Sequence, residues 1–463
     1  MSSRMVDERE DLTERLLEEA KAELRSALPL SAARYERVLE RPRMGTSRSR
    51  FWPLPIYVDH ARGARLTDID GREYVDCNMG HGPLVLGHAS PVVLEAVEAQ
   101  LERGTHYGPP SPRELELAEI LVEGVPGAER VAFLNSGGES TMAAVRLARE
   151  ATGRETVAKF EGGLHGNYEP LLFSVFALGG EASDPVPAVD SGGLPPGIAE
   201  TVVMLPFNDE RAVERIRREG SDWACVIVEP VQGSAGTLPA SEEFLKGVRD
   251  ACSEVGALLI LDEVITAFRL GPHAAAKLYG ISADLTTMGK AIGGGFPVGA
   301  VAGPAELIDL TNTPPGGAAR DAVFVGGTFS GNPLTAAAGA AQLSELTTHP
   351  EHYERLGELG DRMRSGLQAA LADAGIAGFV TGTGSMWGGP YFTTKLPTCI
   401  RDVAASNQGA ARLYSTYLIL EGVLMTSPPH LNFLSTAHTE ADVDQVIDAH
   451  RAVLGRLAAS GVV

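Results

Sequence analysis

The stretch Leu258-Leu-Ile-Leu-Asp-Glu-Val264 carries an unbroken apolar run that leads directly into an acidic side chain. An apolar run without polar alternation is typical of a strand buried on both faces of a parallel sheet. Similar runs alternate with stretches of helical periodicity earlier in the chain. The expected strands are Val131–Leu134, Thr156–Phe160, Thr201–Leu205, Ala224–Val228 and Ala257–Leu261, and the helices among them cover 139–151 and 241–255. This alternation predicts an α/β architecture with a mostly parallel sheet.

Away from this region the sequence predicts more helix than strand. A DG turn between two short alternating runs predicts a small hairpin over Asp68–Asp76. Residues 177–200 are rich in Gly and Pro, and we expect a mobile loop there. The expected helices cover 8–28, 90–104, 112–124, 334–347, 351–374, 407–421 and 439–458.

Composition excludes several classes of partner. The 463 residues include 39 Lys and Arg against 60 Asp and Glu, a net charge of −21. Nucleic acid or an anionic membrane would require a basic face, so we expect neither as a partner. The first residues are too acidic and polar for a signal peptide, and no apolar run reaches the roughly 18–20 residues that span a bilayer, so we expect the cytosol. The four cysteines form no CxxC or Cys/His cluster, and no metal site is expected.

Lysine is rare in this chain, since only six of the 39 basic residues are Lys. One of them, Lys290, ends an apolar run and is followed by the glycines Gly293–Gly295. Glycines let a ligand and the backbone approach closely. A partly desolvated Lys in such a place has a lowered pKa and is suited to Schiff-base formation. The alternative is a solvated lysine in a loop.

Two further motifs place chemistry at strand ends. Asp262 ends the buried run, where a carboxylate needs a cationic or hydrogen-bonding partner; a helix N-cap or a structural ion pair is the alternative. Ser136-Gly-Gly138 follows an expected strand and opens a helix, whose free N–H groups bind anions; an ordinary turn is the alternative. Parallel strands end at one edge of a sheet. An acid, an amine nucleophile and a phosphate cradle at that edge are the set that pyridoxal 5′-phosphate (PLP) requires.

The sequence resembles the class III, fold-type I PLP-dependent aminotransferases over about residues 35–455. Within that family it is most similar to the branch that holds glutamate-1-semialdehyde aminomutase, the β-phenylalanine aminotransferases and D-phenylglycine aminotransferase. The motifs that carry the resemblance are LLILDEV (258–264), DLTTMGKAIGGGFPVGA (284–300), NSGGEST (135–141), IVEPVQG (227–233) and GGTFSGNP (326–333). The resemblance implies a large PLP-binding domain (78–335) with a mostly parallel sheet of seven-stranded type between helices. A smaller α+β domain would comprise 336–463, joined by the N-terminal helix and substrate loop of 1–77.

The resemblance also implies roles for individual residues. Lys290 would form the Schiff base with the cofactor and move protons, and Asp262 would hold the pyridinium nitrogen. Val264 would pack on one face of the ring. The family is typically homodimeric, and Thr328 would reach the phosphate in the neighbouring subunit. The remaining cofactor contacts would be Ser136, Gly137 and Gly138 at the phosphate, Gln232 near the ring oxygen, and Glu229 in the same polar lining.

Two positions depart from the family pattern. Gly138 stands where members usually carry Thr, so a phosphate-binding hydroxyl is missing. Leu164 stands where members usually stack Tyr on the cofactor ring. Leucine keeps the apolar contact but loses aromatic stacking, worth about 0.5–1.5 kcal/mol, so we expect weaker cofactor binding. The adjacent His165 is expected to be a structural or supporting residue.

Resemblance also suggests substrate contacts. Arg48, in the TSRSRF segment, matches the carboxylate-binding Arg of β-phenylalanine aminotransferases, and Trp52 would wall an apolar pocket. His81 lies in HGPLVLGH, which resembles the D-phenylglycine enzyme. His430 matches an acidic position of the aminomutase. The β-phenylalanine type has a second Arg for dicarboxylate acceptors, and here that place is held by Pro429.

Three functions are compatible with these residues. The main expectation is an aminotransferase that moves the amino group of a β- or aromatic amino acid to an oxo-acid acceptor by a ping-pong mechanism. The first alternative is an aminomutase that shifts an amino group within one molecule; it needs no acceptor, which suits Pro429, and the 177–200 loop would gate it. The second alternative is an inactive PLP-fold scaffold, suggested only by Gly138 and Leu164.

Overall fold

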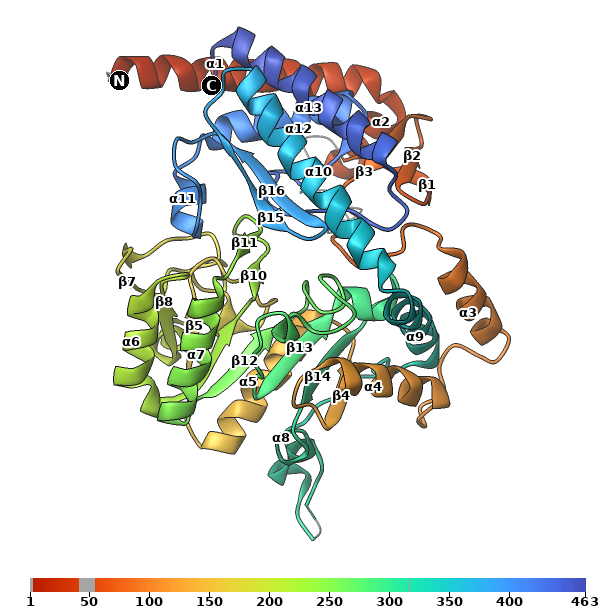
Figure 1. Ribbon diagram of the computed structural model, residues 1–463, viewed down its shortest axis with the longest axis vertical. Helices are drawn as coiled ribbons and strands as arrows, with labels where there is room; N and C mark the ends of the chain where they lie inside the picture. Colours follow the sequence, from red (N-terminus) through yellow and green to blue (C-terminus); the bar gives the residue numbers. More distant parts are fainter. Residues whose placement is uncertain (1–2, 41–54, 315) are drawn as a thin grey trace.

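The computed structural model describes residues 3–40, 55–314 and 316–463 (Figure 1). Its centre is a seven-stranded sheet in the order β4-β14-β13-β12-β9-β5-β8. Every neighbouring pair is parallel except those of β14, which runs antiparallel to β13 and β4. The strands are β4 (Arg130–Leu134), β14 (Gly299–Gly303), β13 (Leu285–Gly289), β12 (Leu258–Asp262), β9 (Trp223–Val228), β5 (Thr156–Phe160) and β8 (Val202–Leu205). The predicted mostly parallel sheet of seven-stranded type is confirmed.

The continuous apolar runs have a simple cause, which is that helices cover both faces of this sheet. In β9, Val226 and Val228 join one hydrophobic cluster while Cys225 and Ile227 join another on the opposite face. The first cluster includes side chains of α4 (Pro112–Gly124), α6 (Glu210–Glu219) and α7 (Glu242–Val255). The second is built on α5 (Gly137–Thr152). Side chains on both faces of each strand are therefore buried.

A second group of sheets and helices, which we call the upper layers, lies above the large sheet in Figure 1. It contains segments from both ends of the chain. One sheet has the order β1-β2-β3-β17 and joins β1 (Val58–Arg62), β2 (Arg65–Asp68) and β3 (Glu73–Asp76) to β17 (Val423–Leu424). Another joins β15 (Phe379–Thr383), β16 (Met386–Tyr391) and β18 (Asn432–Phe433). Because β3 pairs with β17, the N-terminal hairpin belongs to the same sheet as a C-terminal strand.

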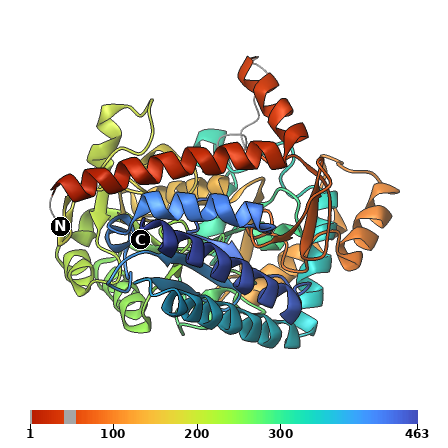
Figure 2. The same ribbon diagram turned by 90° about the horizontal axis from the view of Figure 1, so that it is seen from above.

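Helices cover these smaller sheets, and Figure 2 shows α1 running alongside α12, with α13 on the other side of α12. They are α1 (Ser3–Ala27), α2 (Pro29–Glu40), α10 (Glu351–Asp373), α11 (Ile400–Ala404), α12 (Gln408–Leu420) and α13 (Glu440–Ser460). The helix α9 (Pro333–Thr348) packs on α4 and on α3 (Pro91–Leu101). It runs without a break through residue 336, where the domain boundary is predicted.

Some elements differ from the sequence expectations. The helix α6 was not predicted; it begins at the N-cap Asp209, whose side chain accepts from the Arg211 N–H. The antiparallel β14 and the four-residue α8 (Ala305–Ile308) were also not predicted. Within 177–200 the chain forms the short strands β6 (Gly180–Glu181) and β7 (Asp184–Pro185); β10 (Val231–Gln232) and β11 (Leu238–Pro239) form a separate pair. Among the described helices, none is both long and apolar enough to span a membrane.

Candidate active site

A cavity of about 850 Å³ opens at the carboxyl edge of the central sheet. Its lining comes from the turn after β4, the loop after β5, the end of β12, and the residue that follows β13. These elements end at one edge because β4, β5, β12 and β13 all run in the same direction in the sheet, so residues far apart in sequence meet there. Of the predicted site residues, the cavity lining includes His81, Ser136, Gly137, Gly138, Leu164, Glu229, Asp262, Val264 and Lys290.

The turn between β4 and α5 forms the N-terminal end of a 16-residue helix at the cavity. Ser136 is the N-cap, and its hydroxyl accepts from the Glu139 N–H at 3.2 Å. The turn is closely packed: a Cβ at Gly137 would lie 2.6 Å from Cγ1 of Val264, and one at Gly138 would lie 3.3 Å from Cα of Gly166. Close packing accounts for the two glycines, and the free N–H groups of the first helical turn are suited to bind a phosphate.

Asp262 is buried at the end of β12 and is held in one orientation by three donors. Its Oδ1 accepts from the Val264 N–H at 3.0 Å and from the Thr287 hydroxyl at 3.3 Å. Its Oδ2 accepts from His165 Nδ1 at 2.6 Å. Burial lowers the pKa of His165, against the opposing effect of Asp262. A neutral His165 with its proton on Nδ1 therefore donates to the carboxylate and fixes its orientation.

Lys290 follows β13 with a positive φ of 47°, a conformation that non-glycine residues rarely adopt. Desolvation lowers the pKa of Lys290, although the carboxylates of Asp262 and Glu229 oppose the shift. A lowered pKa increases the fraction of neutral amine, which is the nucleophilic form. A strained backbone and a desolvated amine are features that concentrate at functional sites, and Lys290 combines both.

Glu229 lies beside this amine and organises the loop over the cavity. Its Oε1 accepts from the Leu164 N–H at 3.0 Å, and its Oε2 accepts from the Gly233 N–H at 3.1 Å. Burial raises the pKa of Glu229 to about 8, with a further contribution from Asp262. The Leu164 side chain is 37% exposed at the cavity, so a larger ring at that position has room.

Three predicted residues do not line the cavity. Gln232 is buried and donates from Nε2 to the Glu161 carbonyl at 2.8 Å, so it supports the loop after β5. Thr328 is exposed on the segment that precedes α9. The ring of His430 stacks on Tyr391 at a centroid distance of 5.9 Å, and its neighbour Leu431 lines the cavity in its place. Arg48 and Trp52 lie outside the described residues.

The cavity also includes residues that the sequence analysis did not single out. Asn135 precedes the Ser136 turn, Asn167 follows the Leu164-His-Gly segment, and Ser234 follows Gly233. Each lies within one or two residues of a predicted position, so extending every motif by two residues would have found them. The ion pair of Arg401 with Glu161 had no such signal, because it joins residues 240 positions apart.

The residues present fit PLP at three points. A helix N-terminus faces the cavity from one side, an oriented carboxylate lies at the strand end, and a desolvated amine completes the set. The buried Nε2 of His165 has no hydrogen-bond partner within the described part of the chain, which agrees with a neutral imidazole that donates only to Asp262.

Known proteins resemble this chain along most of its length. It is 42% identical over 410 residues to glutamate-1-semialdehyde 2,1-aminomutase of Methanopyrus kandleri, which covers 88% of this chain and 93% of the relative. An omega-transaminase from Sphaerobacter thermophilus superposes with a TM-score of 0.84 at 36% identity, covering 92% and 97% of the two chains. A glutamate-1-semialdehyde aminomutase from Pseudomonas aeruginosa PAO1 superposes with a TM-score of 0.86 at 27% identity, covering 96% and 99%.

These relatives correct the main functional prediction. The expectation of an aminotransferase is wrong, because the curated relatives at 40–42% identity are aminomutases. The error has a physical reason: Lys290, Asp262 and the phosphate turn serve cofactor chemistry that both reactions share, so they do not distinguish the two activities. The choice rested on the short TSRSRF segment, whereas the similarity to aminomutases extends over 410 residues.

Family membership follows from a match over most of the chain. Residues 47–403 match the family model for class III aminotransferases. A solved relative of the same fold, 34% identical, is a transaminase with PLP bound. The protein is a PLP-dependent enzyme with the chemistry of a transaminase or an aminomutase. We conclude that this chain belongs to the class III aminotransferase family.

Proposed function

We propose that this enzyme is a 2,1-aminomutase that acts on glutamate-1-semialdehyde or a closely similar amino aldehyde. The observation that carries the proposal is the 42% identity over 410 residues to an aminomutase. In such a reaction the amino group leaves carbon 2 and appears on carbon 1 of the same molecule, so no external acceptor is consumed. Pro429 stands where the β-phenylalanine type has a second, acceptor-binding Arg, which is consistent with a reaction that uses no external acceptor.

When bound, PLP supplies an electron sink that makes protons on carbons next to the substrate nitrogen acidic. The chain's own residues direct that chemistry. Lys290 is placed to take a proton at Nζ from one carbon and return a proton to another, since its lowered pKa increases the fraction of neutral amine that can act as a base. Asp262, oriented by His165, would keep a positive charge on the ring nitrogen. The first turn of α5 would hold the phosphate and so fix the reacting carbons against Lys290.

An intramolecular transfer also requires that the substrate stay bound between its two halves. The segment 177–200 is a candidate for the covering element. The Asp190 carboxylate ties it to the preceding loop by accepting the N–H group of Phe176 at 2.9 Å. It also accepts the N–H group of Ala177, at the start of the segment, at 2.8 Å. Arg401 of α11 reaches the same region and donates to the Gly179 carbonyl at 2.9 Å. Closure of this segment would keep water and competing acceptors away from the site.

A homodimer is part of the proposal. The exposed Thr328 is flanked by Phe329, which is 61% exposed, and the same segment includes Phe324, which is 76% exposed. Aromatic side chains exposed together favour a protein interface. In a dimer Thr328 would reach the phosphate of the neighbouring site. The cytosolic location stays a prediction from the sequence.

A substrate assay tests the proposal. The PLP-loaded enzyme is incubated with glutamate-1-semialdehyde alone, and we expect the isomeric amino ketone to form without an oxo acid. Lys290→Ala serves as the inactive control. Turnover that required an added oxo acid, with release of a second amino acid, would refute the aminomutase proposal and leave a transaminase.

A further inference from the structure

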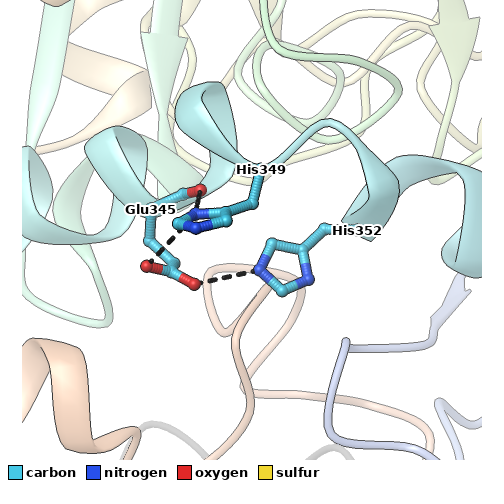
Figure 3. Close-up of side chains that lie close together, drawn as sticks. All are labelled: Glu345, His349 and His352. Carbon is cyan, nitrogen blue, oxygen red and sulfur yellow. Dashed lines mark hydrogen bonds and ion pairs between the residues drawn. The ribbon is translucent and has the colours of Figure 1, made fainter.

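Three metal-ligating side chains gather where α9 meets α10, away from the PLP cavity. Figure 3 shows the carboxylate of Glu345 between the rings of His349 and His352. Glu345 lies in the last turn of α9, His349 is the residue after that helix ends, and His352 lies in the first turn of α10. The three residues are brought together by the bend between the two helices, because α9 ends at Thr348 and α10 begins at Glu351. None of the three residues lines the active-site cavity.

The distances are close to those of a coordination shell. Glu345 Oε1 lies 3.1 Å from His352 Nε2, and Oε2 lies 3.5 Å from His349 Nδ1. One ligand atom from each residue can be chosen so that all lie within 4.8 Å of one another. Ligands about 2.0–2.2 Å from a tetrahedral Zn²⁺ are about 3.3–3.6 Å apart. The two carboxylate–imidazole distances already match this range, and a change in the side-chain torsions of the exposed His349 would bring the third ligand atom into the shell.

The charges and the exposure suit a cation from solvent. Glu345 makes both of its ion pairs with these two histidines. The His349 side chain is 48% exposed, and those of Glu345 and His352 are 27% and 24% exposed. An ion can reach the site, and water can complete its shell.

Metal binding would break one hydrogen bond of the ion-free protein. His349 Nδ1 also lies 3.0 Å from the Glu345 carbonyl, so in the ion-free protein it donates there and caps the end of α9. Coordination through Nδ1 replaces that hydrogen bond and transfers the ring proton to Nε2. Metal affinity should therefore fall at acidic pH, where protonated imidazoles no longer offer a lone pair.

The place of the cluster suggests what an ion would do. The helix α9 packs on α3 and α4 beside the large sheet, whereas α10 packs on α13 and β15 in the upper layers (Figure 1). Glu345 comes from the first helix and His352 from the second. An ion held by both helices would stabilise the α9–α10 junction, where the chain passes from the large sheet to the upper layers.

We propose that Glu345, His349 and His352 bind one divalent transition-metal ion of the Zn²⁺ type, which braces the α9–α10 junction. Two imidazoles and one carboxylate suit Zn²⁺, Co²⁺ or Ni²⁺, whereas Mg²⁺ and Ca²⁺ require mainly oxygen ligands. The site is separate from the PLP chemistry and does not depend on the proposed reaction.

The test titrates ZnCl₂ into the chelator-treated, PLP-loaded enzyme by calorimetry. We expect one ion per chain, and His352→Ala and His349→Ala should each weaken binding by at least about tenfold, the loss that removal of even an outer partner of a metal site produces. His60→Ala is the matched control, because His60 is also exposed and paired with a carboxylate, Asp59, at 3.0 Å. It should leave the affinity unchanged. The titration is done in a Cys399→Ser background, since Cys399 is a partly exposed thiol that also attracts Zn²⁺.

Co²⁺ supplies a second readout that does not depend on stability. The parent enzyme should give visible d–d absorption of a nitrogen–oxygen site, and His352→Ala should abolish it. Equal Zn²⁺ binding by the parent and both histidine variants, absence of binding at millimolar Zn²⁺, or equal competition by Mg²⁺ would each overturn the proposal. Circular dichroism of the variants checks that α9 and α10 remain folded.

Discussion

The two sides of the active-site cavity are built by different means. On the sheet side, Asp262 and Lys290 follow neighbouring strands, and their positions are set by hydrogen-bonded pairing of β12 with β13. On the opposite side, His81 and Leu431 come from loops more than three hundred residues apart in sequence. Strand pairing makes the sheet side rigid, and short sequence motifs are enough to predict it. The loop side depends on how loops that are distant in sequence pack together. We infer that the first side determines the cofactor chemistry and the second determines the substrate.

Removing the amine on the sheet side should have the largest effect. Lys290→Ala deletes both the nucleophile and the proton carrier, and general acid–base catalysis alone is worth about 10²–10⁴-fold. We expect turnover to fall by at least about 10³-fold, with loss of the visible absorption band of PLP bound to lysine. Lys277→Ala, a lysine outside the cavity, is the control. A variant that kept the band would show that another amine holds the cofactor.

The acid at the strand end should come next. Asp262→Asn keeps the shape but removes the charge, and loss of one preorganised electrostatic group costs about 10²–10³-fold in kcat. His165→Gln should have a smaller effect in the same direction, since it acts only through the carboxylate at 2.6 Å. Stopped-flow measurement of the half-reaction checks both. Equal rates for Asp262→Asn and the parent enzyme would remove Asp262 from the cofactor site.

The ion pair that joins the loop after β5 to α11 lies outside the cavity lining and should matter less, but measurably. Arg401 of α11 makes a bidentate pair with Glu161 in the loop after β5, with both distances at 2.8 Å. The Glu161 side chain is only 5% exposed, so Arg401→Ala leaves a buried charge unpaired, at a cost of about 1–3 kcal/mol. We expect lower thermal stability and a raised KM while PLP binding persists.

Lys395→Ala is the matched control for Arg401. Lys395 pairs with Asp402 beside the same helix at 2.6 Å, but its side chain is 71% exposed. Exposed pairs contribute about 0–1 kcal/mol, so the control should resemble the parent enzyme. If Arg401→Ala and Lys395→Ala had the same thermal stability and KM, the Arg401–Glu161 pair would not be what holds the loop after β5 to α11.

The departure at Leu164 should produce a modest gain when reversed. Leu164→Tyr restores a ring over the cofactor, and aromatic stacking is worth about 0.5–1.5 kcal/mol, or about two- to tenfold in PLP affinity. Fluorescence titration of the apoenzyme measures the change. Leu164→Met, which adds no ring, should leave the affinity within about twofold. A Tyr variant that bound PLP no more tightly would show that the cavity has adapted to leucine.

Substitution of His430 should have the smallest effect. It tests whether His430 contacts the substrate, as the sequence analysis predicted, or only packs on Tyr391. Its ring packs on Tyr391, so His430→Phe should change KM less than about twofold, within the range of a tolerated isosteric change. Burial lowers the pKa of His430 to about 4. The unfolded chain, with a pKa near 6.5, binds more protons between these values, so stability is lost as pH falls through that window. His430→Phe should flatten this loss in denaturant titrations at several pH values, whereas a large change in KM would restore His430 to the substrate site.

The sequence predicted well where one physical signal dominates. The apolar runs located β5 and β12 almost to the residue, because strands buried on both faces carry mainly apolar side chains. The buried Lys159 of β5 is tolerated because its Nζ donates to the carbonyls of Leu171 and Phe173. It predicted less well where charged surface conceals periodicity, as in α6, whose first and last turns carry charged side chains. Gln232 and His430 were assigned to the site by resemblance, and neither is among the residues that line the cavity. Thr328 was assigned to the site of a neighbouring subunit, and that assignment stays a prediction.

The strand ends, helix starts and tight turns of this chain are therefore determined by its local sequence. The run into Asp262, the turn at Ser136 and the glycines after Lys290 specify strand ends, a helix start and a close approach of backbone, and these features imply PLP on their own. Contacts between distant segments follow a different rule, since they depend on how the layers pack. The Arg401–Glu161 pair and the meeting of the His81 and Leu431 loops at one cavity exist only after packing has brought their backbones together.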